Sequence, residues 1–261
     1  MSIHPSAIIE DGAQIGRNCQ IGPFCHIGAG VRLGAEVRLH SHVAIAGDTA
    51  IGDKTEIWPF ASVGSQPQDL KFAGEKTQLR IGARTMIRES VSINPGTAGG
   101  GGLTQIGDDC LFMLGTHVGH DCQIGNQVVV ANHASLAGHV QVGNEVIIGG
   151  LAGIHQFVRI GEGAIIGALS MVVADVIPFG SVSGERPGLA GLNLIGLKRR
   201  GIARDQISGL RVAYKSLFTG SGTLKERAEA LVDGQENELV REILDFVLSD
   251  SDRSFCTPKE K

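Results

Sequence analysis

Five of the nine histidines in this 261-residue chain fall between residues 117 and 155. A step of 18 residues from His120 reaches Gly138, and a second step reaches Gln156. A chain that repeats every 18 residues would therefore gather imidazoles along one edge. One coil back, allowing for the phase slip between Ile93 and Ile106, the count reaches Asn94 and Pro95. The residues expected along this edge are Asn94, His120, Gly138, His139, His155 and Gln156, with His117 close by.

Such an edge has three interpretations. It is a solvated polar edge, or a metal site, or the site of a general base. Three convergent histidines suit zinc, and trimeric prisms of the γ-carbonic anhydrase kind use histidines in this way between subunits. A histidine near neutrality can instead take a proton from an alcohol.

His120 is the candidate base because the carboxylate of Asp121 follows it directly. Gly138, one repeat later, has no side chain and can offer its backbone N–H to a developing oxyanion. The turn that begins at Asn94, together with His117, would then bind substrate.

The element that positions these residues is a six-residue repeat. An aliphatic residue recurs every sixth position from Ile3 to Val63, resumes in phase at Ile81, and after the slip continues from Ile106 to Val172. One inward aliphatic residue per side predicts a three-sided prism of short parallel strands, with 18 residues in each of about nine stacked coils. The 38 glycines are expected mostly at the corners, where left-handed backbone favours them.

Two segments interrupt the prism. Residues 65–78 keep the 18-residue phase but lose the aliphatic anchors, and residues 98–103 contain four consecutive glycines. We expect both to be loops, and interrupted repeats are often functional. The prism is predicted for residues 1–186 and a helical domain for residues 187–261, with helices at 204–218, 224–231 and 239–248 and frayed residues from about 249.

Composition excludes several classes. The net charge of -4 gives no basic excess for nucleic acid. No apolar run approaches the roughly 20 residues of a membrane helix, and the first residues lack the features of a signal peptide. The five cysteines are expected to be reduced, which fits a cytoplasmic protein.

Seven motifs go beyond the repeat. They are Gln68-Asp69-Leu70-Lys71 before Gly74-Glu75, Ile87-Arg88-Glu89-Ser90-Val91, Pro95-Gly96-Thr97 before Gly100-Gly101-Gly102-Leu103-Thr104, Val118-Gly119-His120-Asp121-Cys122, Ala137-Gly138-His139-Val140, His155-Gln156-Phe157 and Gly196-Leu197-Lys198-Arg199-Arg200-Gly201. Over nearly the whole chain, these motifs resemble the UDP-N-acetylglucosamine O-acyltransferases of lipid A synthesis. The resemblance implies an all-β left-handed parallel β-helix, a hexapeptide prism of about nine coils, with a C-terminal α-helical domain.

The resemblance also implies an activity: transfer of a 3-hydroxyacyl chain from acyl carrier protein to the glucosamine 3-hydroxyl of UDP-N-acetylglucosamine, the first step of lipid A synthesis. It implies His120 as general base, Asp121 as its support and the Gly138 N–H as oxyanion donor. It implies a homotrimer with sites between subunits, no metal and no other cofactor. The positions similar to substrate contacts are Gln68, Asp69, Lys71, Asn94, His117, His139, His155, Gln156, Asn193, Arg199 and Arg200.

Three parts of the sequence depart from the family pattern. Asn94 stands where many members have histidine, so it is expected to bind and not to transfer protons. Ile195 replaces a glutamate near the uridine. Ala168, Leu169 and Met171 fall where the acyl chain is measured and are bulkier than glycine, which predicts a chain of about twelve carbons or fewer.

A basic patch precedes an acidic tail. Lys198, Arg204, Arg211 and Lys215 are accompanied by only one acid within residues 198–215. The patch is an ordinary solvated helix surface or a docking site for the acidic acyl carrier protein. A γ-carbonic-anhydrase-like metalloenzyme and a non-catalytic scaffold remain the alternatives to the acyltransferase.

Overall fold

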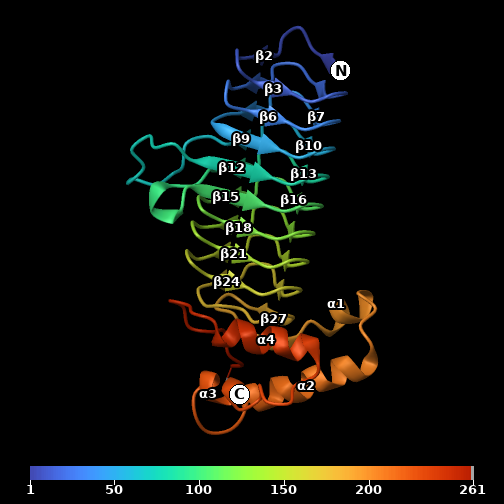
Figure 1. Ribbon diagram of the computed structural model, residues 1–261, viewed down its shortest axis with the longest axis vertical. Helices are drawn as coiled ribbons and strands as arrows, with labels where there is room; N and C mark the ends of the chain where they lie inside the picture. Colours follow the sequence, from blue (N-terminus) through green and yellow to red (C-terminus); the bar gives the residue numbers. More distant parts are fainter. Residues whose placement is uncertain (260–261) are drawn as a thin grey trace.

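The computed structural model describes residues 1–259, so the end of the predicted helical domain lies outside the described residues. Three sheets, parallel except for one strand pair, form the sides of a triangular prism, with the N-terminus at one end and the helices at the other (Figure 1). We call the sheets faces A, B and C. Face A holds eleven strands, face B nine and face C eight, as expected for about nine coils.

The strands are short and follow one another around the prism. Face A contains β1 (Ser2–Ile3), β4 (Gln20–Ile21), β7 (Arg38–Leu39), β10 (Glu56–Ile57), β13 (Met86–Ile87), β16 (Leu111–Phe112), β19 (Val129–Val130), β22 (Ile147–Ile148), β25 (Ile165–Ile166), β27 (Gly180–Ser183) and β28 (Gly188–Leu192). Face B contains β2 (Ile8–Ile9), β5 (His26–Ile27), β8 (Ala44–Ile45), β11 (Ser62–Val63), β14 (Ser92–Ile93), β17 (His117–Val118), β20 (Ser135–Leu136), β23 (Gly153–Ile154) and β26 (Met171–Val172). Face C contains β3 (Gln14–Ile15), β6 (Arg32–Leu33), β9 (Asp48–Ile51), β12 (Gln78–Ile81), β15 (Leu103–Ile106), β18 (Gln123–Ile124), β21 (Gln141–Val142) and β24 (Arg159–Ile160).

The predicted anchors fill the inside of the prism. In a typical strand the first residue points outward and the second is buried, as in β18, where Gln123 is exposed and Ile124 is buried. Stacked strands pair in parallel register at 18-residue steps, for example His117 with Ser135 and Ser135 with Gly153. The period thus fixes which side chains stand above one another on each face.

The prediction that left-handed backbone explains the glycines of the prism is wrong. Within residues 1–259, eighteen residues other than glycine have positive φ, among them Asp121 and His139. Most glycines that follow an anchor do not have positive φ, and they are small because the next coil is close. A Cβ on Gly16 would lie 2.2 Å from the carbonyl oxygen of Gly34. Close stacking of coils, more than left-handed backbone, therefore explains these glycines.

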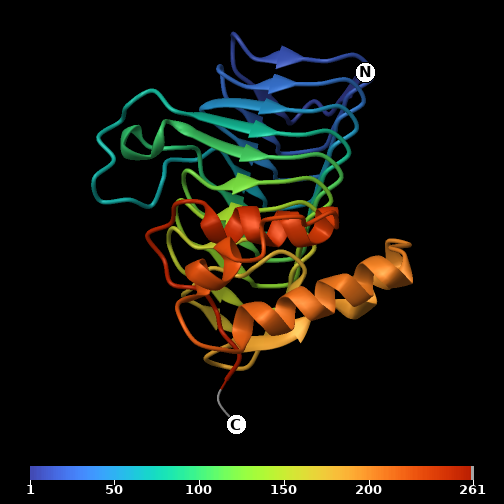
Figure 2. The same cartoon turned by 60° about the horizontal axis from the view of Figure 1, so that its bottom comes forward.

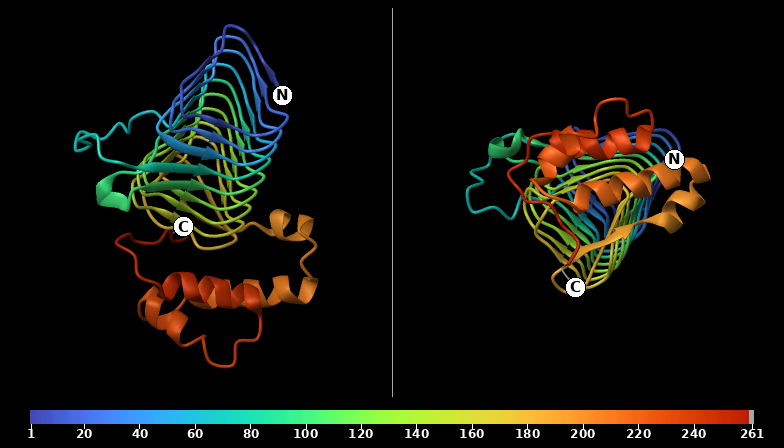
Figure 3. Two further views of the ribbon diagram at one scale, coloured as in Figure 1. Left: turned by 45° about the horizontal axis from the view of Figure 1, so that its top comes forward. Right: turned by 90° about the horizontal axis from the view of Figure 1, so that it is seen from below.

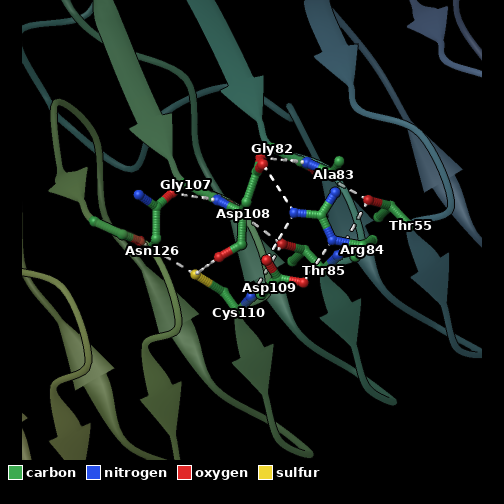
Figure 4. A network of polar contacts seen from close by, with 11 residues as sticks. Thr55, Gly82, Ala83, Arg84, Thr85, Gly107, Asp108, Asp109, Cys110 and Asn126 are labelled. Carbon is green, nitrogen blue, oxygen red and sulfur yellow. Dashed lines mark hydrogen bonds and ion pairs between the residues drawn. The ribbon is translucent and has the colours of Figure 1, made fainter.

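Polar side chains connect the corners of successive coils (Figure 4). The Arg84 guanidinium binds Asp109 at 2.6 Å and Asp108 at 3.1 Å. Asp108 also accepts the Ala83 N–H at 2.8 Å, and its own N–H donates to Asn126 Oδ1 at 2.8 Å. These side chains connect three successive coils at this corner of the prism.

Both predicted interruptions are loops on the same side of the prism (Figure 2). The first connects β11 to β12, and the second contains a short 3-10 helix, η1 (Ala98–Gly100), before β15. Glu75 in the first loop accepts the Ala98 N–H in the second at 3.1 Å. The two loops therefore form one connected projection.

The C-terminal part contains α1 (Leu194–Arg199), α2 (Arg204–Phe218), α3 (Leu224–Glu229) and α4 (Glu238–Leu248). The last three lie close to the predicted helices, whereas α1 was not predicted. It lies across the end of the prism (Figure 3). The helical part begins later than residue 187, because β28 pairs antiparallel with β27 and extends face A. The expected fraying after Ser249 is also wrong for the residues described. Cys256 N–H donates to the Asp175 carbonyl at 2.8 Å, which returns the tail to the prism.

A buried arginine joins the prism to the helices. Arg159 binds Asp175 through Nε at 2.7 Å and Ser249 Oγ through Nη1 at 2.7 Å, and its guanidinium lies 4.6 Å from the centre of the Phe246 ring. All five cysteines are free thiols, as predicted. Among the described residues, no helix is long and apolar enough to cross a membrane.

Candidate active site

An open cavity of about 460 Å³ lies along face B and the adjoining corner toward face C. The stacking that the period predicts is confirmed here, because His117, Ser135, Gly153 and Met171 follow one another in register. The predicted site residues that line this cavity are Gln68, Asn94, His117, His120, Gly138, His155, Gln156 and Met171.

His120 and Asp121 form a buried pair at the corner. His120 Nδ1 lies 2.8 Å from Asp121 Oδ2, with side-chain exposures of 10% and 0%. Asp121 has φ of 60°, and this left-handed backbone directs its side chain away from the cavity and toward the second loop. A carboxylate oxygen accepts hydrogen bonds, so Nδ1 of His120 carries the hydrogen and Nε2 has the free lone pair. Nε2 is then the atom that can remove a proton from a substrate hydroxyl.

Gly138 lies directly against the His120 ring. A Cβ on Gly138 would be 2.4 Å from Cε1 and 2.6 Å from Nε2 of His120. Gly138 is buried, and no acceptor among the described residues receives its N–H. The candidate base and a buried backbone N–H that has no acceptor among the described residues therefore lie side by side, as base and oxyanion donor do in an acyl-transfer site.

Two more histidines surround the base. His117 Nδ1 is 2.7 Å from Ser92 Oγ, and burial lowers the pKa of His117. Burial also lowers the pKa of His139, against the opposing charges of Asp121 and Asp69. The His139 ring meets His120 edge-on at 4.9 Å and stacks on Phe157 at 4.4 Å. Both rings favour the neutral form, in which they can donate and accept hydrogen bonds to a sugar.

Asn94 holds the first loop. Its Nδ2 donates to the carbonyls of Ser65 and Gln66 at 3.1 and 3.3 Å, whereas its Oδ1 is buried without a hydrogen-bond partner. The amide thus has a structural contact on one side and a free acceptor on the other.

Two of the predicted substrate contacts, Asp69 and Lys71, lie in the first loop. Asp69 accepts the Lys71 N–H at 3.0 Å, and the Lys71 side chain is exposed. Neither residue lines the cavity, although Asp69 is near enough to influence the pKa of His139.

One contact at the site was not predicted. Arg253 Nη2 lies 2.9 Å from His155 Nδ1 and connects the C-terminal tail to the site. Arg253 follows no periodic pattern, and it is separated from His155 by 98 residues, so the sequence carries no signal for this contact.

The predicted nucleotide residues lie elsewhere. Asn193, Ile195, Arg199 and Arg200 line a second cavity of about 540 Å³, which borders face A. Asn193 Oδ1 accepts the Gly196 N–H at 2.9 Å and caps α1. One chain therefore carries the two predicted parts of a substrate site on different faces.

Arg200, one of the predicted nucleotide contacts, forms ion pairs within the chain. Its guanidinium pairs with Glu145 at 2.9 Å and with Glu162 at 2.6 Å. These carboxylates are 55 and 38 residues distant, and the local motif gives no sign of them. Arg200 is held by two acids, which leaves Arg199 as the more available cation in this cavity.

The proposed acyl-length residues separate into two groups. Met171 lines the cavity with His120, and its sulfur is 3.4 Å from the point where a Cβ on Gly153 would lie. Ala168 and Leu169 are exposed and do not line the cavity. The basic residues Lys198, Arg204, Arg211 and Lys215 are exposed, and none of them forms an ion pair within the described part of the chain.

A group that could hold a metal exists within the described residues. The ligand atoms of His120, Asp121 and His139 lie within 4.8 Å of one another. Asp121, however, is already bound by Thr97 through both carboxylate oxygens, at 2.8 and 2.6 Å. The same carboxylate also receives His120 Nδ1, so its accepting positions are largely taken.

The prism, the helical end and the histidine–carboxylate pair define a hexapeptide-repeat acyltransferase. A family model described as bacterial transferase hexapeptide (six repeats) matches residues 12–47, and one described as UDP N-acetylglucosamine O-acyltransferase, domain 2, matches residues 175–256. The acyl-[acyl-carrier-protein]–UDP-N-acetylglucosamine O-acyltransferase of Methylobacterium radiotolerans is 60% identical over 99% of this chain and 96% of its own, and that of Caulobacter vibrioides is 50% identical over 100% of both. The chain belongs to this family of O-acyltransferases.

Solved structures agree. A crystal structure of a UDP-N-acetylglucosamine acyltransferase matches with a TM-score of 0.96 and 42% identity, covering 100% of both chains. The UDP-N-acetylglucosamine acyltransferase from Campylobacter jejuni matches with a TM-score of 0.94 and 40% identity, covering 99% of this chain and 100% of that one. The predicted family, the left-handed β-helix with a helical C-terminal part, and the enzyme class are confirmed, and the metalloenzyme alternative is not favoured.

Proposed function

We propose that this enzyme moves a 3-hydroxyacyl chain from the thioester of acyl carrier protein to the 3-hydroxyl of UDP-N-acetylglucosamine, which begins lipid A synthesis. The observation that carries the proposal is the His120–Asp121 pair against the free N–H of Gly138. This arrangement supplies a base and an oxyanion donor at one point.

The chemistry follows from these atoms. His120 Nε2 takes the proton of the sugar hydroxyl while the oxygen attacks the thioester carbonyl. The carbonyl oxygen becomes an oxyanion, which the Gly138 N–H stabilises. Collapse of the tetrahedral intermediate breaks the carbon–sulfur bond, and the protonated His120 returns the proton to the departing thiolate. No metal or other cofactor is needed for any of these steps.

We propose that three copies assemble with the site between neighbours. Face A is polar outside in its N-terminal strands, with Gln20, Arg38 and Glu56, and becomes apolar toward the helices. The apolar outward residues are Met86, Leu111, Val129, Ile147 and Ile165. A neighbour covering this stripe would bring its face-B cavity toward the Arg199 cavity, so that one substrate meets both.

The donor protein would approach α2. Arg204, Arg211 and Lys215 are seven and four residues apart, so they share one side of this helix. A cationic helix side without internal partners suits an acidic carrier protein. Charge reversal at Arg211 should raise the KM for acyl carrier protein several-fold and leave the KM for the sugar nucleotide nearly unchanged. Equal KM values for the carrier in wild type and variant would remove this part of the proposal.

Met171 is the best candidate for a residue that limits acyl length. It lines the cavity and follows Gly153 in register on face B, so we retain the expectation of a chain of about twelve carbons or fewer. Five free thiols and a carrier-protein donor also favour the cytoplasm as the place of work.

The decisive experiment incubates the enzyme with UDP-N-acetylglucosamine and carrier proteins loaded with 3-hydroxyacyl chains of different length. Mass spectrometry should detect an O-acylated sugar nucleotide, and the rate should fall beyond about twelve carbons. Absence of acyl transfer with every chain would contradict the function. A strong preference for fourteen carbons would contradict only the length. Elemental analysis tests the absence of a metal, since stoichiometric zinc or iron would revive the metalloenzyme alternative.

A further inference from the structure

Asp121 is held mainly by one residue outside the catalytic pair. The Thr97 N–H donates to Asp121 Oδ1 at 2.8 Å, and the Thr97 hydroxyl donates to Asp121 Oδ2 at 2.6 Å. Thr97 is itself buried, and the Asp121 side chain has no exposed surface. The two bonds fix both oxygens of the carboxylate, and Oδ2 is the oxygen that also faces His120 Nδ1.

The segment after Thr97 closes over the carboxylate. Thr97 precedes η1, and its carbonyl accepts the N–H groups of Gly100 and Gly102 at 3.0 and 2.8 Å. A Cβ on Gly100 would lie only 2.0 Å from Asp121 Cγ. The missing side chain of Gly100 therefore lets the backbone lie directly on the carboxylate, where a side chain would force the two apart.

The covering segment is anchored from the other loop. Glu75 accepts the Ala98 N–H at 3.1 Å and the Ala73 N–H at 2.8 Å, and hydrogen bonds to these backbone groups lower the pKa of Glu75. Thr97 and Gly100 thus belong to a fixed element and not to a free glycine-rich turn.

We propose that Thr97 is a positioning residue for acyl transfer: its two hydrogen bonds, beneath the close cover of Gly100, aim Asp121 Oδ2 at His120 Nδ1 and so keep the His120 lone pair on Nε2. The proposal rests on the proposed function, because it assigns Thr97 a role in the proton transfer described there. A hydrogen bond to a charged partner is among the stronger ones in proteins, so its loss should be measurable in the rate.

The test compares Thr97→Ser with Thr97→Ala. Both lose the methyl group and only serine keeps the hydroxyl, so the pair isolates the hydrogen bond to Oδ2. We expect kcat to be about tenfold lower in the alanine variant than in the serine variant, with KM for UDP-N-acetylglucosamine within about twofold. Equal kcat values would overturn the proposal, as would a difference confined to KM.

A double-mutant cycle separates positioning from general support of the fold. If Thr97 acts through Asp121, the alanine and serine variants should have the same kcat within about twofold once Asp121→Ala is also present. A tenfold difference that persists without the carboxylate would show that Thr97 acts elsewhere, and would overturn the proposal.

The glycine pair gives a second control. Gly100→Ala should lower kcat by about tenfold, because the new Cβ displaces the carboxylate, whereas Gly99→Ala has open space and should not lower it. Equal effects of the two substitutions would contradict the close contact between the Gly100 backbone and the Asp121 carboxylate.

The experiments distinguish a failure of the proposed function from a failure of the role that we assign to Thr97. Wild-type enzyme that transfers no acyl chain would end that function, and the hydrogen position on His120 can still be read by nitrogen-15 NMR of histidine-labelled protein. We expect the hydrogen on Nδ1 in Thr97→Ser and a mixture of tautomers in Thr97→Ala. The same single tautomer in both would overturn the role of Thr97.

Discussion

The prism carries two histidine–carboxylate pairs of the same length in different surroundings. In the N-terminal coils, His40 Nε2 lies 2.8 Å from Glu56 Oε1, and the side chains are 37% and 27% exposed. At the corner between faces B and C, His120 Nδ1 lies 2.8 Å from Asp121 Oδ2, and the side chains are 10% and 0% exposed. Distance alone therefore does not distinguish the two pairs.

The difference lies in what surrounds each carboxylate. Glu56 also contacts Arg38 at 3.4 Å at the surface, and His40 stacks on Trp58 at 5.1 Å. The buried carboxylate of Asp121 accepts two hydrogen bonds from Thr97, has His139 Nε2 3.8 Å away, and pairs with a histidine that lies beside the backbone of Gly138. Exposed ion pairs contribute little because water and salt screen them. A reactive pair requires burial, a fixed orientation and a nearby hydrogen-bond donor for the negative charge that develops on the carbonyl oxygen.

The largest expected difference between the two regions concerns glycine. Gly138→Ala places a Cβ 2.6 Å from His120 Nε2 and disturbs the oxyanion donor, so kcat should fall by about 10²–10³-fold. Gly28→Ala in the N-terminal coils meets its nearest atom at 3.4 Å and should leave kcat unchanged. Steady-state kinetics of both variants measure this, and equal rates would remove the distinction between the regions.

The carboxylates themselves provide the next comparison. Asp121→Asn cannot hold the Nδ1 hydrogen in the same way, and we expect kcat to fall by at least about tenfold. Glu56→Gln changes a surface pair of the same length, so its kcat should match that of the wild type. An unaffected Asp121→Asn enzyme would argue against the pair as the source of the base.

The smallest expected effect is on stability at low pH. Burial lowers the pKa of His117 below the value near 6.5 of an unfolded chain, so the unfolded state binds the proton first as pH falls. The contribution of His117 is present above about pH 6.5 and is lost as pH falls below it. Between pH 7.5 and 5.5, the wild-type Tm should fall by about 2 °C more than that of His117→Gln.

Calorimetry of that variant needs a matched control at an exposed histidine. His4→Gln, at the exposed N-terminal coil, should follow the wild-type curve across the same pH range. If His4→Gln flattens the curve as much as His117→Gln does, burial of His117 is not the cause.

The sequence predicts most of the fold and the edge of the site, because a regular 18-residue coil determines which residues stack on one another. The step from His120 to Gly138 and Gln156 needed no structure, and the helix of residues 204–218 was predicted at its observed bounds. The glycines were assigned to the right places for the wrong reason, because the distance between coils is a property of their stacking and not of one coil.

The parts that the sequence could not predict lie where the period is broken. Thr97 meets Asp121 across a step of 24 residues, since the second loop adds residues that the 18-residue count does not contain. Arg253 reaches His155 from the tail, and Arg200 meets Glu145 and Glu162 from the helical part. Contacts between elements of different type depend on tertiary packing, for which a repeat gives no register.

The most direct test of the central claim is a single-turnover assay of His120→Ala beside His40→Ala, with UDP-N-acetylglucosamine and 3-hydroxyacyl carrier protein. Because only His120 is placed as the base, its variant should transfer the acyl chain about 10²–10⁴ times more slowly than the wild type while remaining folded. His40→Ala should transfer at the wild-type rate. A folded His120→Ala enzyme that keeps the wild-type rate would contradict the account.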